Sequence, residues 1–437
     1  MYGATPLPPS SSLPSSSKTI IQPKTGLWLE EDDDDESLVS STPLLSRKSP
    51  WRRRSWFLAL LGMILLIWQW TVTNWRDATT RSNFKKNKTT TTTTSQSTVS
   101  VTPVIGIFSQ PRHHRHRRTG QSQQQEQQFY IAASYVKWLE AGGARTIAIP
   151  YDAPVPVPTN QTNNTTDDFL LDDILNQVHA IFLPGGATVM SPAIQYVLDK
   201  VVDLNLRPDD NIVFPVWGTC LGFEFLLQYI GNGGANTQYH PSQMTREILQ
   251  SGFDAENISL PLQHVVASHK DSLYTPPHIH EIVTTHNTTL NNHVMGITPQ
   301  AFLSNPNLTA IWDITSTNID RKGRPFVSTI EPKLRKRDER PILPFYGVQY
   351  HPEKNAFEYA FYPGTTIPYE VIDHSPSGIE FSMYLARRVV ALARQNLHAR
   401  YVDPHRFPMI SSSHYPIIPG TTFEQIYLIP SASNWTS

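Results

Sequence analysis

The sequence has little cysteine and little charge, and both shortages exclude classes of protein. Cys220 is the only cysteine among 437 residues, so neither an intramolecular disulfide nor a cysteine-rich zinc site can hold this fold together. Charged residues make up 17% of the chain, and 36 basic and 37 acidic residues nearly cancel to a net charge of −1. This balance argues against a chain that binds nucleic acid or anionic lipid through bulk charge.

Apolar residues are also scarce in the first 55 residues, where Ser, Pro and Thr dominate. An acidic run, EEDDDDE at 30–36, would repel itself if this segment were compact. Such a segment cannot bury enough apolar area to offset the conformational entropy that is lost on ordering. We therefore expect residues 1–55 to form a disordered tail.

Residues 56–75, WFLALLGMILLIWQWTVTNW, form an uncharged apolar run that follows three arginines at 52–54. About twenty helical residues span roughly 30 Å, the thickness of the hydrocarbon core of a bilayer. The run therefore predicts a transmembrane signal-anchor helix. A buried core helix and a cleaved signal peptide are the alternatives. The first rarely follows an arginine triplet, and the second rarely begins so far into a chain.

The arginines before this run also predict its orientation. They favour a cytosolic N-terminus, and hence a single-pass type II membrane protein with a lumenal body in a vacuole, a lysosome-like compartment or the Golgi. Secretion is the alternative if the run is cleaved. Residues 76–100 lack apolar periodicity and predict a polar stalk. All the Asn-X-Ser/Thr sequons follow the run, as expected of a lumenal glycoprotein, and begin at Asn87, Asn160, Asn163, Asn164, Asn257, Asn287, Asn307 and Asn434.

From residue 101 the chain alternates short apolar runs with amphipathic segments. Helical patterns such as SPAIQYVLDKVVDL at 191–204 separate the strand-like runs, which lie at 101–108, 146–149, 178–183 and 212–217. This alternation predicts an α/β domain with a mostly parallel sheet, whose strands are apolar because helices cover both faces. We expect the domain to span 101–397 and a proline-rich C-terminal extension to follow at 398–437.

The single cysteine lies in the most informative segment of the domain. The segment PVWGTCLGFE at 215–224 contains a buried strand, then Gly-X-Cys-X-Gly, and leads into the apolar helix FEFLLQYI. A sharp strand-to-helix turn needs small residues on both sides of a nucleophile. Cys220 would stand at a helix N-terminus, where the dipole and free amides favour a thiolate. The alternative, an inert buried cysteine, does not explain the two glycines.

A second apolar strand ends in a residue that fits a general base. His351 comes directly after PFYGVQY at 344–350, where a loop residue is held by a rigid scaffold. Glu353, two residues further on, is placed to orient the imidazole. Cys220, His351 and Glu353 then form a nucleophile, base and orienting group of the kind that recurs on unrelated folds.

Four segments together resemble one enzyme family. They are YIAASYVKWLEAGGA at 130–144, FLPGG at 182–186, PVWGTCLGFE at 215–224 and YGVQYHPEKN at 346–355. In this order they are similar to gamma-glutamyl hydrolases, peptidases of the class I glutamine amidotransferase-like group that trim folate polyglutamates. The resemblance covers about residues 101–397 and implies a doubly wound α/β fold with flanking helices.

The resemblance also implies a role for each site residue. Cys220 would be the nucleophile, His351 the general base and then the acid, and Glu353 the orienting group. The backbone amides of Gly186, beside Gly185, and of Leu221 would form the oxyanion hole. The residues implied on the substrate side are Glu224, His293 and Tyr130.

Some features depart from the family pattern. Two basic stretches, at 112–128 and 331–340, look like insertions, and we interpret them as solvated loops rather than as sites for an anionic substrate. Phe129 and Tyr350 stand where the family often has tyrosine and tryptophan. None of these departures removes an expected catalytic atom.

The resemblance predicts hydrolysis of the poly-γ-glutamate tail of a small-molecule folate, by way of a thioester on Cys220 and without metal or organic cofactor. Two alternatives stay open, namely a glutaminase-like hydrolase of another γ-glutamyl compound and a catalytically inactive, membrane-tethered binding protein. A homodimer and the choice between endo and exo cleavage also stay open. We expect no nucleic-acid partner.

Overall fold

The structure is a computed structural model, and the residues that it describes all lie in the unit Gln96–Ser437. They are 102–112, 128–156, 170–207, 212–234, 248–336, 338–397, 399, 403–420 and 423–435. The predicted tail, transmembrane helix and stalk, at 1–55, 56–75 and 76–100, lie outside the described residues. Within the described residues, none of the helices combines the length and the apolar character needed to cross a membrane.

The centre of the domain is a seven-stranded sheet in the order β4-β1-β5-β6-β11-β10-β9. The strands from β4 to β11 run parallel, whereas β10 lies antiparallel to both β11 and β9. This mostly parallel sheet confirms the predicted fold class. The strands in sheet order are β4 (Arg145–Ile149), β1 (Val104–Phe108), β5 (Ala180–Leu183), β6 (Val216–Thr219), β11 (Phe345–Val348), β10 (Pro325–Pro332) and β9 (Trp312–Ile319).

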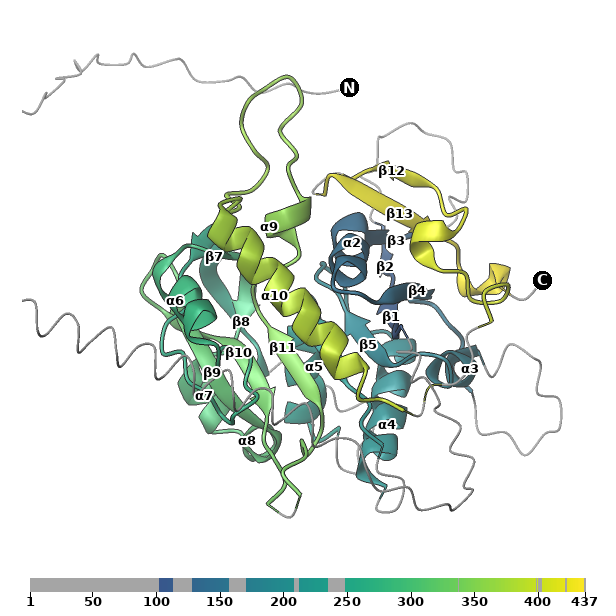
Figure 1. The fold of residues 1–437 in the computed structure, drawn as a ribbon, viewed down its shortest axis with the longest axis horizontal. Helices are drawn as coiled ribbons and strands as arrows, with labels where there is room; N and C mark the ends of the chain where they lie inside the picture. The colour runs from purple at the N-terminus through teal and green to yellow at the C-terminus, as the bar shows by residue number, and fades with distance from the viewer. Residues whose placement is uncertain are drawn as a thin grey trace, which may run out of the picture. The chain divides into compact units, whose positions relative to one another are not determined.

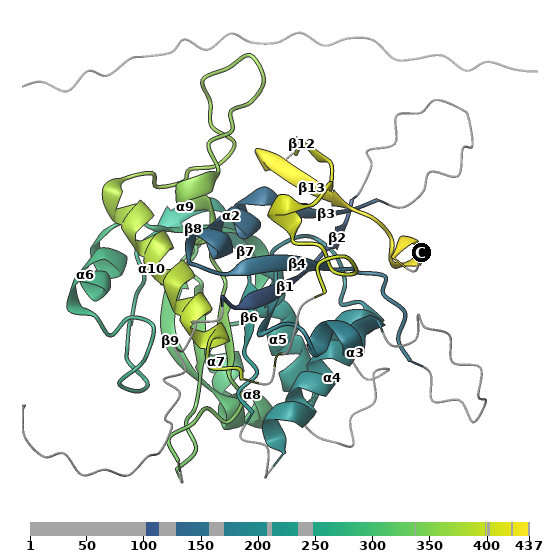
Figure 2. The same ribbon diagram turned by 45° about the vertical axis from the view of Figure 1, so that its right-hand side comes forward.

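Helices cover both faces of this sheet, as Figures 1 and 2 show. One face packs against α4 (Pro192–Leu206) and α5 (Leu221–Gly231), and the other against α2 (Ala133–Ala141) and α10 (Pro376–Ala393). The remaining helices are short: α3 (Leu170–Leu175), α6 (Pro277–Thr285), α7 (Pro299–Leu303), α8 (Pro306–Ile311) and α9 (Lys354–Phe357).

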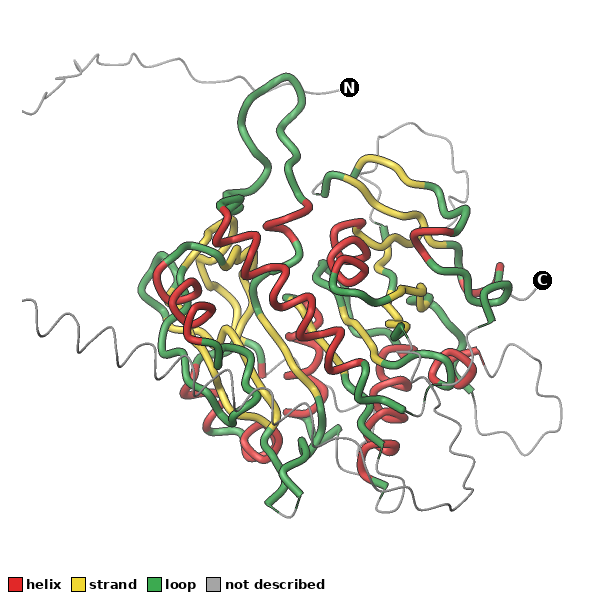
Figure 3. The backbone as a smooth tube through the Cα atoms, in the orientation of Figure 1, coloured by secondary structure: helices red, strands yellow, loops and turns green. Residues whose placement is uncertain are grey.

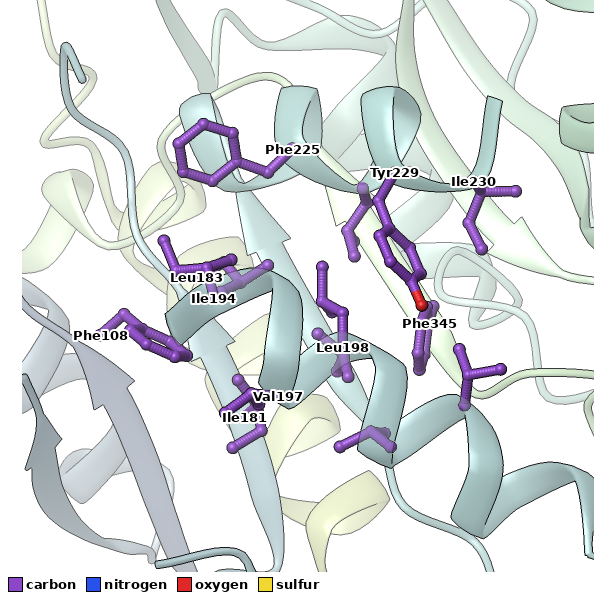
Figure 4. Close-up of a cluster of buried hydrophobic side chains, with 14 of the residues drawn as sticks. Phe108, Ile181, Leu183, Ile194, Val197, Leu198, Phe225, Tyr229, Ile230 and Phe345 are labelled. Carbon is purple, nitrogen blue, oxygen red and sulfur yellow. The ribbon is translucent and has the colours of Figure 1, made fainter. Parts of the chain in front are cut away.

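The two cores follow from the alternation of side chains along the strands. Phe108 points to the face of α4 and α5, and its neighbour Ile107 to the face of α2 and α10. Figure 4 shows the first core, where Ile194 and Leu198 of α4 lie between the sheet and α5. Because apolar side chains are needed on both faces, the central strands β1, β5, β6 and β11 are buried throughout, as the sequence predicted.

The C-terminal segment differs from the predicted boundary at residue 397. It contributes β12 (Ile417–Pro419) and β13 (Gln425–Ile429), and β13 pairs with β3 (Phe129–Ala132) in a second sheet of order β12-β13-β3-β2. β2 is Gln110–Pro111. Ile426 and Ile429 are buried in the same core as α2. Residues 403–420 and 423–435 are therefore part of the α/β domain, and apolar contacts with β3 and α2 hold them there.

Two further features flank the end of the sheet where the parallel strands terminate. The antiparallel pair of β7 (Gln250–Leu260) and β8 (Thr289–Gly296) lies beside β9 and β10. The loop 358–375 between α9 and α10 extends away from the body in Figure 3. Several of its side chains are exposed and aromatic, namely Tyr359, Phe361 and Tyr362.

Candidate active site

Cys220 occupies a sharp turn between β6 and α5. Its φ of 51° is rare for a residue with a side chain, and this strain is typical of a functional position. A Cβ on Gly218 would lie 2.6 Å from the backbone of Gly222, and a Cβ on Gly222 would collide with the carbonyl of Leu183. The backbone N–H of Cys220 donates to the Val348 carbonyl at 2.8 Å. The two glycines thus permit the turn, and β11 anchors it.

His351 and Glu353 follow β11 and are bonded to each other. Nδ1 of His351 lies 2.8 Å from Oε1 of Glu353, and the two residues are 5% and 0% exposed. The backbone N–H of His351 donates to the Leu290 carbonyl of β8 at 2.9 Å. Because Nδ1 faces the carboxylate, Nε2 is the nitrogen that remains for chemistry at the thiol.

Electrostatics at this pair favour a charged imidazole. Burial lowers the pKa of His351, but the carboxylate of Glu353 and then Cys220 raise it more strongly, to about 10. At neutral pH the ring therefore holds its second proton beside the thiol. A protonated imidazole next to sulfur stabilises a thiolate, which is the nucleophilic form of cysteine.

Gly185 lies close to both the nucleophile, Cys220, and the base, His351. A Cβ at this position would lie 2.7 Å from Cε1 of His351 and 3.2 Å from Cβ of Cys220. The backbone N–H of Gly185 donates to the hydroxyl of Tyr135 at 2.9 Å, and that hydroxyl lies 3.4 Å from Nδ1 of His351. Tyr135 was not predicted as a site residue, although it lies in the YIAASYVKWLE segment.

Two backbone amides, those of Gly186 and Leu221, are the predicted donors of an oxyanion hole. Leu221 is the first residue of α5, so its N–H has no acceptor within the helix. Gly186 follows Gly185 directly after β5, the strand next to β6 in the sheet. The positive end of the helix dipole also lies at Leu221 and would stabilise negative charge there.

Glu224 lies one helical turn below Cys220 and is 7% exposed. Burial raises its pKa to about 7, although the side chain of Gln349 and the charge of His351 both lower it. Nε2 of Gln349 donates to Oε1 of Glu224 at 3.2 Å, and Oε1 of Gln349 has no partner among the described residues. Gln349 is therefore a second site residue that was not predicted from the sequence.

His293 extends the site from β8. Its Nδ1 lies 2.7 Å from the Met295 carbonyl, so Nδ1 carries the hydrogen. Burial lowers the pKa of His293 to about 4, which leaves the ring neutral at physiological pH. Its Nε2 is buried and has no partner among the described residues. The ring is held edge-on against Phe326, with centroids 4.8 Å apart.

Tyr130 lies further out than the other predicted site residues. It is half-buried in β3, and its ring centroid lies 6.1 Å from that of Phe423 in the C-terminal segment. Nζ of Lys354 lies over the same Phe423 ring at 5.0 Å and pairs with Glu370. Tyr130 and Lys354 thus both lie against Phe423, whereas the hydroxyl of Tyr135 lies 3.4 Å from Nδ1 of His351.

No group of three or more His, Cys, Asp or Glu side chains that could hold a metal ion occurs in the part of the chain that the structure describes. The arrangement instead combines a strained cysteine, a charged imidazole, a carboxylate and free amides. These groups are suited to acyl transfer from an amide by way of a covalent intermediate.

Sequence relatives identify the family. A gamma-glutamyl hydrolase B of Dictyostelium discoideum is 30% identical over 350 residues, which are 78% of this chain and 86% of that protein. The chain belongs to the gamma-glutamyl hydrolase family. Gamma-glutamyl hydrolase 1 of Arabidopsis thaliana is 30% identical over 75% of this chain and 82% of its own length. The gamma-glutamyl hydrolase of Homo sapiens is 27% identical over 75% of this chain and 89% of its own length.

Membership of the gamma-glutamyl hydrolase family makes the chain a hydrolase of γ-glutamyl bonds. No model of a protein family matches the chain. Among solved structures, the glutaminase domain of Trypanosoma brucei CTPS with bound acivicin covers 69% of this chain and 96% of its own at 15% identity. Its TM-score of 0.35 is too low to support an argument.

Proposed function

We propose that this gamma-glutamyl hydrolase cleaves folate poly-γ-glutamates through a γ-glutamyl thioester on Cys220. The observation that carries the proposal is that Cys220 and His351 lie close to one backbone position, since a Cβ on Gly185 would lie 3.2 Å from Cβ of Cys220 and 2.7 Å from Cε1 of His351. Glu353 holds the imidazole from the other side, at 2.8 Å. A thiol, a base and an orienting carboxylate in this arrangement support nucleophilic catalysis.

The first half of the reaction forms the thioester. The thiolate of Cys220 adds to the γ-carbonyl carbon, and the amides of Gly186 and Leu221 donate to the oxygen that becomes negative. His351 gives its proton to the amide nitrogen as the C–N bond breaks. The leaving glutamate, or a shorter chain of glutamates, departs as an amine, and the acyl part stays on sulfur.

The second half restores the enzyme. His351, now neutral, accepts a proton from water, whose oxygen adds to the thioester carbonyl. The C–S bond then breaks, the acyl part leaves as a carboxylic acid, and the thiolate returns beside the protonated imidazole. Every proton that His351 gives in the first half is regained here.

The folate part of the proposal rests on the resemblance of four sequence segments to enzymes that trim folate polyglutamates. The direct test compares wild-type enzyme with Cys220→Ala and follows glutamate release from a folate pentaglutamate by mass spectrometry. We expect release by wild-type enzyme and none above background by the variant. Undiminished glutamate release by Cys220→Ala would refute the thioester mechanism. If wild-type enzyme released glutamate from free glutamine but not from the folate pentaglutamate, the proposed substrate would be refuted.

We further propose that residues 56–75 anchor the enzyme as a type II membrane protein with its domain in the lumen. This proposal rests on the uncharged run, the arginines at 52–54 and the sequons that follow. In microsomes that carry a doubly tagged protein, we expect protease to remove the N-terminal tag and spare the domain. Protection of the N-terminal tag with loss of the domain would overturn the orientation.

A further inference from the structure

We propose that Gln110 binds the α-carboxylate of the glutamyl residue whose γ-carbonyl Cys220 attacks, which makes Gln110 a determinant of substrate specificity. The inference rests on the proposed function, because it assigns a ligand within the same site. Gln110 lies two residues beyond the end of β1 and forms the short strand β2 with Pro111.

The topology of the sheet places Gln110 in a binding position. From β1 the chain passes by way of α2 to β4 on one side, and it then returns to β5 on the other side of β1. The helices α2 and α4 that follow β1 and β5 cover opposite faces of the sheet. The carboxyl ends of β1 and β5 therefore border a switch point, where open α/β sheets bind their ligands.

The side chain of Gln110 runs along the loop that is expected to hold the oxyanion. A Cβ on Gly186 would lie 2.8 Å from Oε1 of Gln110 and 3.1 Å from its Cδ. A Cβ on the neighbouring Gly185 would lie close to Cβ of Cys220 and Cε1 of His351. Along the edge of the sheet the order is therefore Gln110 at β1, Gly186 at β5, Cys220 at β6 and His351 at β11.

The amide of Gln110 has no partner among the described residues. The residue is 3% exposed, and neither Nε2 nor Oε1 makes a hydrogen bond. A buried polar group without a partner costs about 1–3 kcal/mol. Apolar side chains such as Leu fit a β-strand at least as well, so an unpaired amide here indicates a ligand that pairs with it.

The order of residues along this edge indicates which group of the substrate lies beside Gln110. His351 protonates the leaving amine, so the leaving residue lies on the His351 side of Cys220. Gln110, on the opposite side, faces the residue that is acylated. That residue carries an α-carboxylate in a γ-linked chain, and the NH₂ group of an amide donates two hydrogen bonds without adding charge.

The test uses two γ-glutamyl dipeptides that differ only at the acylated residue, one with an α-carboxylate and one with an α-carboxamide. Wild-type enzyme is expected to prefer the carboxylate. For Gln110→Ala we expect KM for the carboxylate substrate to rise about tenfold, with kcat within about twofold, as for loss of one hydrogen bond to a charged group. KM for the carboxamide substrate should change little.

Gln110→Glu keeps the size of the side chain and replaces the donor by a carboxylate. This variant should lose still more activity on the carboxylate substrate. The ratio of kcat/KM for the carboxylate substrate to kcat/KM for the carboxamide substrate should fall to about one or below. The matched control is Gln300→Ala, which changes an exposed glutamine on α7 and should leave both substrates unaffected.

An equal fall in kcat on both substrates would overturn the proposal, because it would mean that Gln110 only packs against the Gly186 loop. Unchanged preference in Gln110→Glu would overturn it as well. Failure of wild-type enzyme to cleave either dipeptide or a folate polyglutamate would instead refute the proposed function, so the two failures are distinguishable.

Discussion

Glu353 holds His351 by a contact between residues that are only two positions apart in the chain, with Nδ1 and Oε1 separated by 2.8 Å. Both side chains are buried, and Pro352 between them stiffens the backbone. The same Nδ1 lies 3.4 Å from the hydroxyl of Tyr135. The imidazole is thus oriented from two elements, which leaves Nε2 for the thiol.

Glu353→Gln should lower kcat by roughly 10²–10⁴-fold, because an amide in place of the carboxylate favours the wrong imidazole tautomer. The pKa of His351 should also fall from about 10, since Glu353 is the strongest group that raises it. A pH profile of kcat/KM checks both effects. Glu380→Gln, which changes an exposed glutamate on α10, is the control and should match wild type. A wild-type profile in Glu353→Gln would contradict the role of the pair.

The raised pKa of His351 also predicts how stability varies with pH. Its folded value of about 10 lies above the ordinary value of 6.5, so this group's stabilisation is complete below pH 6.5 and is lost as the pH rises toward 10. Glu353→Gln should reduce the fall in Tm across this window relative to wild type. Thermal unfolding followed at several pH values measures it, and parallel curves for the two proteins would contradict the expectation.

Gly185→Ala should inactivate the enzyme without unfolding it. The added Cβ would lie 2.7 Å from both Cε1 of His351 and the hydroxyl of Tyr135, so the base must move away from Cys220. We expect kcat to fall about 100-fold or more, as for misplacement of a catalytic group by about 1 Å. Gly323→Ala is the control for a loss of stability alone. Its Cβ meets no atom within 4 Å, but its φ of +80° strains an alanine, so this variant should be less stable and keep its kcat. Equal activity of the two variants would contradict the proposed geometry.

Glu224 should make substrate binding depend on pH near neutrality. Burial raises its pKa to about 7, so the group is protonated below this pH and charged above it. A γ-glutamyl chain is anionic, and a charged Glu224 would repel it. KM should therefore rise roughly threefold to tenfold as the pH increases through 7. Glu224→Gln should abolish this rise, and persistence of the inflection in the variant would contradict the assignment.

The C-terminal strands should contribute to the stability of the catalytic domain. Ile429 in β13 is 3% exposed, so Ile429→Ala should lower the free energy of unfolding by about 2–4 kcal/mol. Ile417→Ala in the neighbouring β12 is the matched control, since Ile417 is 53% exposed and its truncation should change stability by about 0.5 kcal/mol or less. Chemical denaturation measures both. Similar losses in the two variants would indicate that residues 403–435 do not pack as described.

The sequence predicted the parts of the fold whose signal is local. Five strands, β1, β4, β5, β6 and β11, and the helices α4 and α5 overlap segments that were expected to form them, because apolar runs and helical periodicity are contained in short windows. The turn at Cys220 was predicted for the same reason, since strand, glycines and helix are contiguous. His351 and Glu353 were predicted because they lie three and five residues beyond the end of β11.

The remaining features depend on contacts between distant segments. From the sequence, Tyr135 is expected to be a core residue of an apolar helix. Its hydroxyl lies near His351 because α2 packs against α9, the helix that begins just after Glu353. The sequence could not show this, since the two residues are 216 positions apart. The C-terminal strands were missed because β12 contains only three residues and ends in proline, so pairing with β3 rather than local propensity defines them.

The most direct test of the central claim, a thioester on Cys220, is competition between water and hydroxylamine for the acyl group. Two substrates with the same acylated residue and different leaving amines are hydrolysed at a fixed hydroxylamine concentration, and the ratio of hydroxamate to acid is measured by mass spectrometry. A common acyl-enzyme predicts the same ratio for both substrates and no product from Cys220→Ala. A ratio that changes with the leaving amine would mean that water attacks the substrate directly, and would contradict the account.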